Sequence, residues 1–233
     1  MRRTLRILTV LVGLLLALAP AYAAQAAPRA TVGGGSAIVI DGRFGCTMTT
    51  VGHDRAGRLI GLTAGHCGHV GSKVSLEDNP AAGVVGRFAR KSEPGDYAVI
   101  TLDPNRVSAV RTAGGATIRS VGAFPPAGAN VCKAGRTTGF SCGPVLQTSS
   151  TDSLSYVCAN HGDSGGPIVM GDRVVGMLNG GLILGIPGTP VKGAIGCVNP
   201  AIPIYSPLVA TKMTAILADL NAQGGVGAGF RPV

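Results

Sequence analysis

Residues 162–167 read Gly-Asp-Ser-Gly-Gly-Pro, and residues 63–67 read Thr-Ala-Gly-His-Cys. The first segment offers the hydroxyl of Ser164 between glycines, and the second offers the imidazole of His66. A serine hydroxyl is a weak nucleophile until a neighbouring base takes its proton, and that base must itself be oriented by a third group. Glycines beside the serine let backbone N–H groups approach a developing oxyanion without a Cβ in the way. Together the two segments predict acyl-transfer chemistry with Ser164 as nucleophile and His66 as general base.

In this order, and with the cysteines, the two segments resemble those of the chymotrypsin-like serine peptidases, specifically the secreted bacterial branch typified by streptogrisins and alpha-lytic protease. The resemblance spans nearly all of residues 33–210. It implies an all-β fold with two six-stranded Greek-key β-barrels, the active site between them and a C-terminal helix. It also implies a monomer that hydrolyses protein or peptide substrates through an acyl-enzyme, with no metal and no organic cofactor.

The third catalytic group should be a carboxylate that holds the tautomer of the histidine. Residues 95–100 read Gly-Asp-Tyr-Ala-Val-Ile, and Asp96 there matches the family pattern of an aspartate that opens an apolar strand. Asp103 ends the same strand and is the competing candidate. Asp54 and Asp78 fit neither the spacing nor the strand context. The resemblance therefore assigns the third role to Asp96.

The resemblance places the oxyanion hole at the backbone N–H groups of Gly162 and Ser164. Asp163 lies between these two residues, and a carboxylate beside a dry active site needs a partner. Residues 132–139 read Cys-Lys-Ala-Gly-Arg-Thr-Thr-Gly, which is very similar to the segment that supplies an internal arginine in bacterial members. We therefore expect an Asp163–Arg136 ion pair to hold the oxyanion loop in its active shape. The alternative is that Arg136 is a surface arginine.

Substrate binding is expected at Asn179, Gly180 and Gly181, which match a Ser-Gly-Gly segment of the family. The backbone of that segment pairs with the substrate as an added β-strand. In the family the serine also supports the catalytic aspartate. Asn179 stands in its place, and its amide can donate the same hydrogen bond but is larger.

The primary specificity pocket is expected to be uncharged. Trypsins hold an acidic residue six positions before the nucleophile, where this chain has Cys158. This favours cleavage after apolar or small-to-medium side chains. His161 lies three positions before the nucleophile and is expected to contact substrate at the pocket entrance. The apolar loop at 182–196 either walls the pocket or packs at the surface.

The chain has six cysteines, and in an exported protein these indicate three disulfides. The spacing alone leaves the pairing open. A zinc site is the alternative, but the spacings C-x-x-C and H-x-x-x-H are absent from the sequence. The resemblance selects the pairs Cys46–Cys67, Cys132–Cys142 and Cys158–Cys197.

The N-terminus has the pattern of a secretory signal peptide. Basic residues precede an apolar run over residues 7–19, and small residues follow. The cleavage rule is met after Ala23 and after Ala26, and we favour the second site. A transmembrane anchor would need about 20 apolar residues. We therefore expect residues 1–26 to be removed and the protein to be secreted, extracellular and without stable membrane insertion.

Composition favours many short strands joined by tight turns. The 233 residues include 37 glycines and no tryptophan, and only 13% are charged. The formal net charge is +9, but the basic residues are scattered and aromatic residues are few. Nucleic-acid binding normally uses clustered basic residues and aromatic side chains that stack on bases. Nucleic acid is therefore not an expected partner.

Turn residues divide the rest of the chain into expected units. Residues 27–33 are expected to be a short processed or flexible segment. The N-terminal barrel should cover 34–122, and the C-terminal barrel with its helix 123–223. Apolar residues recur at helical spacing from Leu208 to Leu220, which predicts the terminal helix. The glycine-rich tail at 224–233 is expected to be loose.

Two other functions fit the same segments. Some proteins with this fold have lost catalysis and act as binding proteins, although they usually lack a member of the triad. An esterase specialised for other acyl groups would use the same three side chains, since a fold and a triad do not define the substrate.

Overall fold

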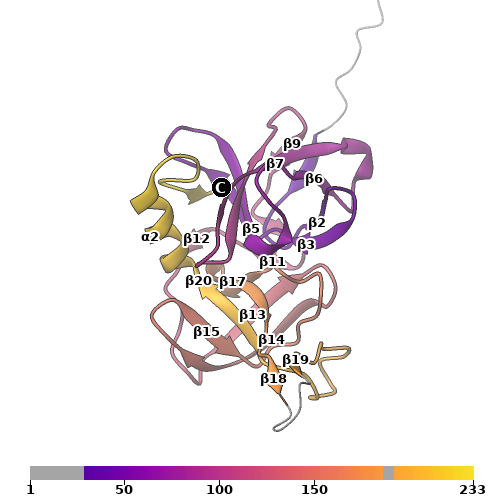
Figure 1. Cartoon of the computed structure of the whole chain (residues 1–233), viewed down its shortest axis with the longest axis vertical. Helices are drawn as coiled ribbons and strands as arrows, with labels where there is room; N and C mark the ends of the chain where they lie inside the picture. Colours follow the sequence, from indigo (N-terminus) through magenta and orange to yellow (C-terminus); the bar gives the residue numbers. More distant parts are fainter. Residues whose placement is uncertain (1–28, 186–191) are drawn as a thin grey trace, which may run out of the picture.

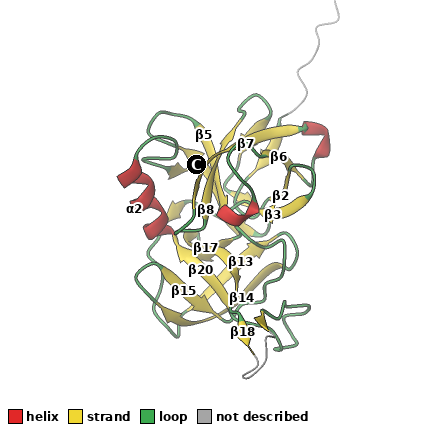
Figure 2. Cartoon of the chain, viewed as in Figure 1, coloured by secondary structure: helices red, strands yellow, loops and turns green. Residues whose placement is uncertain are grey.

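A computed structural model describes residues 29–185 and 192–233, and its regular structure is almost entirely β-strand (Figures 1 and 2). The predicted signal peptide at 1–26 lies outside the described residues. Two β-rich lobes lie one above the other in Figure 1. Within the described part, the single α-helix is α2 (Met213–Gln223), and no helix there is long and apolar enough to cross a membrane.

The N-terminal lobe is one eight-stranded antiparallel sheet in the order β21-β4-β5-β8-β7-β6-β2-β3. The strands β3 and β4 lie at or near opposite ends of this sheet, yet only two residues separate them in the chain, so the sheet must curve strongly. The strands are β2 (Ala37–Ile40), β3 (Phe44–Thr47), β4 (Thr50–His53), β5 (Leu59–Ala64), β6 (Lys73–Leu76), β7 (Val84–Ser92), β8 (Tyr97–Leu102) and β21 (Arg231–Pro232).

The C-terminal lobe is a closed barrel. Its sheet runs β12-β17-β16-β13-β14-β15-β20, and β17 also pairs with β20, which closes a ring of six strands. These strands are β12 (Ser120–Val121), β13 (Asn130–Gly135), β14 (Gly139–Thr148), β15 (Asp152–Ser155), β16 (Pro167–Met170), β17 (Arg173–Gly181) and β20 (Leu208–Lys212). The predicted all-β class with a terminal helix is confirmed, with a closed barrel in the second lobe and a half-barrel sheet in the first.

Short elements complete the chain. The 3₁₀ turns are η2 (Gly65–Cys67) and η3 (Pro80–Ala82). The paired short strands are β1 (Ala30–Val32) with β9 (Val107–Ala109), β10 (Thr112–Ala113) with β11 (Ala116–Thr117), and β18 (Leu184–Gly185) with β19 (Lys192–Gly193). The disulfides Cys46–Cys67, Cys132–Cys142 and Cys158–Cys197 are all present, so the pairing implied by the resemblance is confirmed.

The two lobes and the helix share one apolar core. Leu62 of β5, Met177 of β17 and Ile216 of α2 all belong to the same buried cluster. Burying this surface against both lobes favours one fixed arrangement, since each Å² of apolar area removed from water is worth about 25 cal/mol. The catalytic groups predicted from the two sequence segments therefore lie on two lobes that pack directly on each other.

The terminal helix begins later than its apolar spacing predicts. Leu208 and Val209 fit the helical pattern but belong to β20, which pairs with both β15 and β17. Closing the barrel satisfies the backbone hydrogen bonds of this segment on both sides, so the strand is favoured there over the helix. The helix then starts at Met213.

In both flanking segments that the sequence suggests are flexible, the described residues form strands and make fixed contacts. Residues Ala30–Val32 form β1, and Val32 is fully buried. The tail at 224–233 crosses to the N-terminal lobe, where β21 pairs with β4 and Phe230 is buried (Figure 1). The carboxylate of Asp54 accepts a hydrogen bond from the N–H of Gly227 at 3.1 Å. The glycines of the tail serve tight turns with positive φ rather than flexibility.

Candidate active site

His66 and Asp96 come together because their strands are neighbours. His66 lies in η2 directly after β5, Asp96 directly precedes β8, and these strands pair so that Ala64 faces Tyr97. The Nδ1 atom of His66 is 2.8 Å from Oδ2 of Asp96, and the backbone N–H of His66 donates to Oδ1, also at 2.8 Å. The next residue, Cys67, is tied to Cys46 on β3. The carboxylate therefore holds the imidazole through Nδ1, and a histidine that acts as general base needs this orientation.

Asp96 is itself held by Asn179. The amide nitrogen of Asn179 donates to Oδ2 of Asp96 at 2.9 Å and to its carbonyl at 2.8 Å. The amide oxygen accepts hydrogen bonds from the N–H and the hydroxyl of Thr211. Burial disfavours the charged carboxylate, but hydrogen bonds from His66 and Asn179 outweigh it, so the pKa of Asp96 lies below its usual value. An asparagine thus occupies the supporting position expected of a serine.

The backbone of Asp96 is unusual as well. Its φ is +41°, in a region that residues with a Cβ enter at a cost. Such strain persists only where the surroundings determine the conformation, and it is concentrated at functional sites. Here the carbonyl of Asp96 accepts bonds from Gly65 N–H at 2.8 Å and from Asn179. These contacts fix the carboxylate beneath His66.

Ser164 is brought to His66 from the other lobe. Its carbonyl accepts a hydrogen bond from the N–H of Thr47 at 2.8 Å, and the next carbonyl, of Gly165, accepts one from the hydroxyl of Thr49 at 2.6 Å. A Cβ at Gly165 would lie 2.2 Å from the hydroxyl oxygen of Thr63, so only glycine allows this approach. The loop that carries Ser164 and Gly165 is thus held against β3 and β5.

Ser164 and His66 line one cavity. Among the described residues, no hydrogen bond joins the Ser164 hydroxyl to the imidazole within 3.5 Å. Catalytic hydrogen bonds are often long without substrate and tighten when it binds. The structure therefore brings the three predicted side chains to one place, with the histidine–carboxylate half already bonded.

The backbone N–H groups of Gly162 and Ser164 have no hydrogen-bond acceptor within the part of the chain that the structure describes. The intervening N–H of Asp163 is used, since it donates to the carbonyl of Asn160 at 3.0 Å. Gly162 has a φ of +95°, which glycine reaches without strain. Two unpaired N–H groups beside Ser164 can bind a negative oxygen there.

The predicted Asp163–Arg136 ion pair is wrong, because Lys133 takes that position. The Nζ of Lys133 is 3.2 Å from Oδ2 of Asp163, and both side chains are fully buried. The same carboxylate accepts N–H bonds from Thr137 at 2.8 Å and Thr138 at 3.1 Å. Burial lowers the pKa of Lys133, and the charge of Asp163 opposes this effect. The oxyanion loop is therefore held by a buried lysine.

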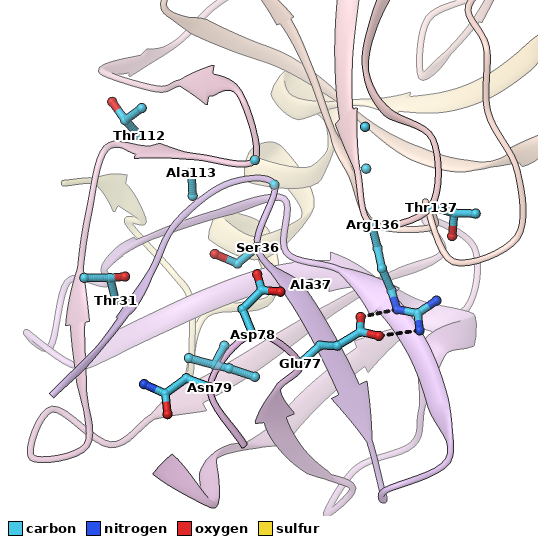
Figure 3. A pocket seen from close by; sticks show the side chains of 15 residues that line it. Thr31, Ser36, Ala37, Glu77, Asp78, Asn79, Thr112, Ala113, Arg136 and Thr137 are labelled. Carbon is cyan, nitrogen blue, oxygen red and sulfur yellow. Dashed lines mark hydrogen bonds and ion pairs between the residues drawn. The ribbon is translucent and has the colours of Figure 1, made fainter. Parts of the chain in front are cut away.

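Arg136 lies just beyond the end of β13 and turns to the N-terminal lobe. Its guanidinium makes a two-pronged ion pair with Glu77, in which Nη2 lies 2.7 Å from Oε1 (Figure 3). Lys133 lies within β13, and its fully buried side chain contacts the carboxylate of Asp163. Arg136 makes no ion pair with that carboxylate and pairs with Glu77 instead. The sequence shows both cations in the same short segment. Their positions relative to the end of β13 decide which of them is buried beside Asp163.

The cavity beside Ser164 has a volume of about 280 Å³, and the described residues that line it include no carboxylate. The four residues expected to contact substrate all line it, namely His161, Asn179, Gly180 and Gly181. Ala194 and Ile195 add an apolar wall, so this part of the 182–196 loop borders the pocket. Sequence reasoning missed Asn160 and Ser206, which are polar, uncharged members of the lining.

Comparisons with known proteins agree with this geometry. The family model for Trypsin matches residues 56–195, and the chain belongs to the trypsin family. It is 32% identical to Streptogrisin-C of Streptomyces griseus over 173 residues, which are 68% of this chain and 37% of that protein. It is 29% identical to Serine protease 2 of Streptomyces fradiae over 170 residues, 64% of this chain and 94% of the other.

Solved structures show the same fold. The crystal structure of Nocardiopsis protease aligns with a TM-score of 0.63 and 26% identity, over 82% of this chain and 97% of that one. The predicted resemblance to secreted bacterial peptidases of the chymotrypsin type is confirmed by these relatives. The chain spans 37% of the length of Streptogrisin-C and 94% of that of Serine protease 2.

Proposed function

We propose that this protein is an active, secreted serine endopeptidase. The observation that carries the proposal is that His66, which is hydrogen-bonded to Asp96, lines the same cavity as Ser164. A protein that had lost catalysis would have no need to keep the ring and the hydroxyl at one cavity with a carboxylate bonded to the ring. Family membership supports peptidase activity for the fold as a whole.

The mechanism follows from the positions of these groups. Ser164 Oγ attacks the peptide carbonyl while Nε2 of His66 takes its proton, and the imidazolium then gives that proton to the leaving amine. Water repeats the sequence on the acyl-enzyme and regenerates the free hydroxyl. Asp96 keeps Nδ1 protonated and stabilises the imidazolium. The N–H groups of Gly162 and Ser164 bind the oxyanion, and one such donor is worth about 3 kcal/mol in the transition state.

The lining of the pocket supports a proposal about substrate preference. Its lining, as far as the chain is described, includes no acidic side chain, so a lysine or arginine of the substrate would lose its hydration without gaining a partner. We propose cleavage after apolar or small-to-medium residues. The segment Asn179–Gly181 ends β17 at the cavity, where its backbone supports pairing with an extended peptide.

Export is supported by two features. Three disulfides form within the described residues, and such bonds persist outside the cytosol. The first residues have the pattern of a signal peptide. We propose that the mature enzyme acts outside the cell as a monomer on protein or peptide substrates.

A digest of a mixed peptide library, read by mass spectrometry, tests the proposal. The parent should cleave internal peptide bonds with apolar or small residues before the scissile bond, and Ser164→Ala should cleave none. No cleavage by the parent would reject the endopeptidase. If the parent then hydrolysed simple acyl esters in a Ser164-dependent way, the esterase alternative would hold, and inertness toward both would favour the binding protein.

A further inference from the structure

The peptide bond between His161 and Gly162 carries one half of the proposed oxyanion hole. The hydroxyl of Thr137 donates a hydrogen bond to the carbonyl of His161 at 2.6 Å. The described residues contain no cis peptide bond, so the carbonyl of His161 and the N–H of Gly162 point in opposite directions. Holding the carbonyl toward Thr137 therefore turns the Gly162 N–H to the opposite side.

Thr137 is well placed for this task because its own backbone is fixed. Its N–H donates to Oδ1 of Asp163 at 2.8 Å, and Asp163 is anchored by the buried Lys133. The hydroxyl lies so close to the loop that a Cβ on Gly162 would be 2.4 Å from it. The carboxylate of Asp163 thus positions Thr137, whose hydroxyl holds the peptide bond between His161 and Gly162.

The 161–162 peptide needs a hydrogen bond that fixes its orientation. Glycine populates positive and negative φ about equally, so the 161–162 peptide can turn over at little local cost. A turned peptide would direct the carbonyl of His161 to the side where the N–H of Gly162 is needed. The negative oxygen of the transition state would then meet an acceptor instead of a donor.

We propose that Thr137 is a positioning residue that keeps the Gly162 N–H in the oxyanion hole. This inference rests on the proposed peptidase function. Thr137 acts through the peptide it binds and not through contact with substrate, so its loss should impair the transition state and leave ground-state binding intact.

Three variants test this. Thr137→Val removes the hydroxyl at nearly constant shape, Thr137→Ser keeps it, and Thr112→Val removes a comparable surface hydrogen bond, between Thr112 and Thr117, away from the site. With a peptide amide substrate, we expect Thr137→Val to lower kcat by about tenfold or more at unchanged KM, since loss of a full donor costs about 10²–10³. Thr137→Ser should recover most of the rate, and Thr112→Val should match the parent.

Inhibitors separate the oxyanion from ground-state binding. A peptide aldehyde forms a tetrahedral adduct that uses the hole, whereas the corresponding peptide alcohol cannot. Thr137→Val should weaken the aldehyde by the same factor as kcat and leave the alcohol unchanged. An equal loss for both inhibitors, an unchanged kcat, or equal impairment of Thr137→Ser and Thr137→Val would overturn the inference.

Failure of the proposed function would look different. The parent would then hydrolyse no peptide and would not be inhibited by the aldehyde. In that case crystal structures of the parent and Thr137→Val decide the inference, because neither depends on activity. A 161–162 peptide turned over in the variant supports it, and the same orientation in both proteins contradicts it.

Discussion

The two halves of the candidate site are held in different ways. In the N-terminal lobe, His66 and Asp96 are positioned by paired strands, a disulfide and hydrogen bonds, two of which come from Asn179 of the other lobe. In the C-terminal lobe, the loop that carries Ser164 is organised around the buried pair of Lys133 and Asp163. The position of His66 and Asp96 depends mainly on a disulfide and on strand pairing. The position of the Ser164 loop depends on the buried charge of Asp163, which must keep its partner Lys133.

This difference predicts different failures. Changes in the N-terminal half should remove chemistry and leave the fold, because the sheet does not need the carboxylate. Changes in the C-terminal half should affect stability and activity together, because an unpaired buried charge is costly and the same charge shapes the oxyanion loop.

The largest effect is expected from Asp96→Asn. The amide cannot hold the required histidine tautomer, so kcat should fall by about 10⁴-fold while thermal unfolding changes little. Steady-state kinetics with a peptide substrate would measure this. Asp103→Asn is the matched control, since Asp103 was the competing candidate and is partly exposed at the other end of β8. A severe loss in Asp103→Asn with an active Asp96→Asn would reverse the assignment.

Lys133→Met should be the next most severe change. It leaves the carboxylate of Asp163 buried without a cation, and breaking such a pair costs about 3–5 kcal/mol. Denaturant unfolding should show this loss together with reduced kcat. The control is Arg136→Met, which removes a partly exposed pair with Glu77 and should cost less than about 1 kcal/mol. The opposite ranking would restore Arg136 as the partner of Asp163.

Alkaline pH should weaken the same pair without mutation. The pKa of Lys133 lies below the ordinary lysine value of 10.5 because burial disfavours its charge. As the pH rises through this lowered pKa, the ammonium loses its proton and Asp163 loses its counter-charge, so kcat/KM should decline before ordinary lysines titrate. Lys133→Arg keeps its charge and should move the decline to higher pH. An identical alkaline limb in both proteins would show that another group controls it.

The smallest of these effects is expected at Asn179. Asn179→Ala removes two hydrogen bonds to Asp96, and a bond to a charged group contributes about 1.5–3 kcal/mol, so kcat should fall tenfold or more. Asn179→Ser retains a donor and should lose less. Kinetics on the two variants would sharpen the description of the N-terminal half, and equal losses would show that the size of the amide matters more than its hydrogen bonds.

Local motifs allowed much of this site to be predicted. Ser164, His66 and Asp96 each stand in a short distinctive segment, and the strands that follow or precede them bring the segments together. The cysteine pairs and the all-β class came from the same resemblance. The uncharged pocket stays a prediction, which rests on Cys158 at the position where trypsins hold an acidic residue.

The errors arose where tertiary contacts choose between equivalent local options. Lys133 and Arg136 are three residues apart, and only the strand register decides which cation is buried. The glycine-rich tail reads as loose until Asp54, in the other lobe, supplies an acceptor for Gly227. Leu208 has helical spacing, but barrel closure makes it part of a strand. None of these partners is near in sequence.

A fluorophosphonate probe tests the central claim most directly, because it reacts with a serine only when that hydroxyl is activated. Labelling should be followed in the parent, His66→Ala and Ser164→Ala, with the modified peptide identified by mass spectrometry. We predict fast labelling of the parent at Ser164 alone, labelling at least about 10³-fold slower in His66→Ala, and none in Ser164→Ala. An unlabelled parent, or equal rates in the parent and His66→Ala, would contradict the convergence of these side chains into a working catalytic group.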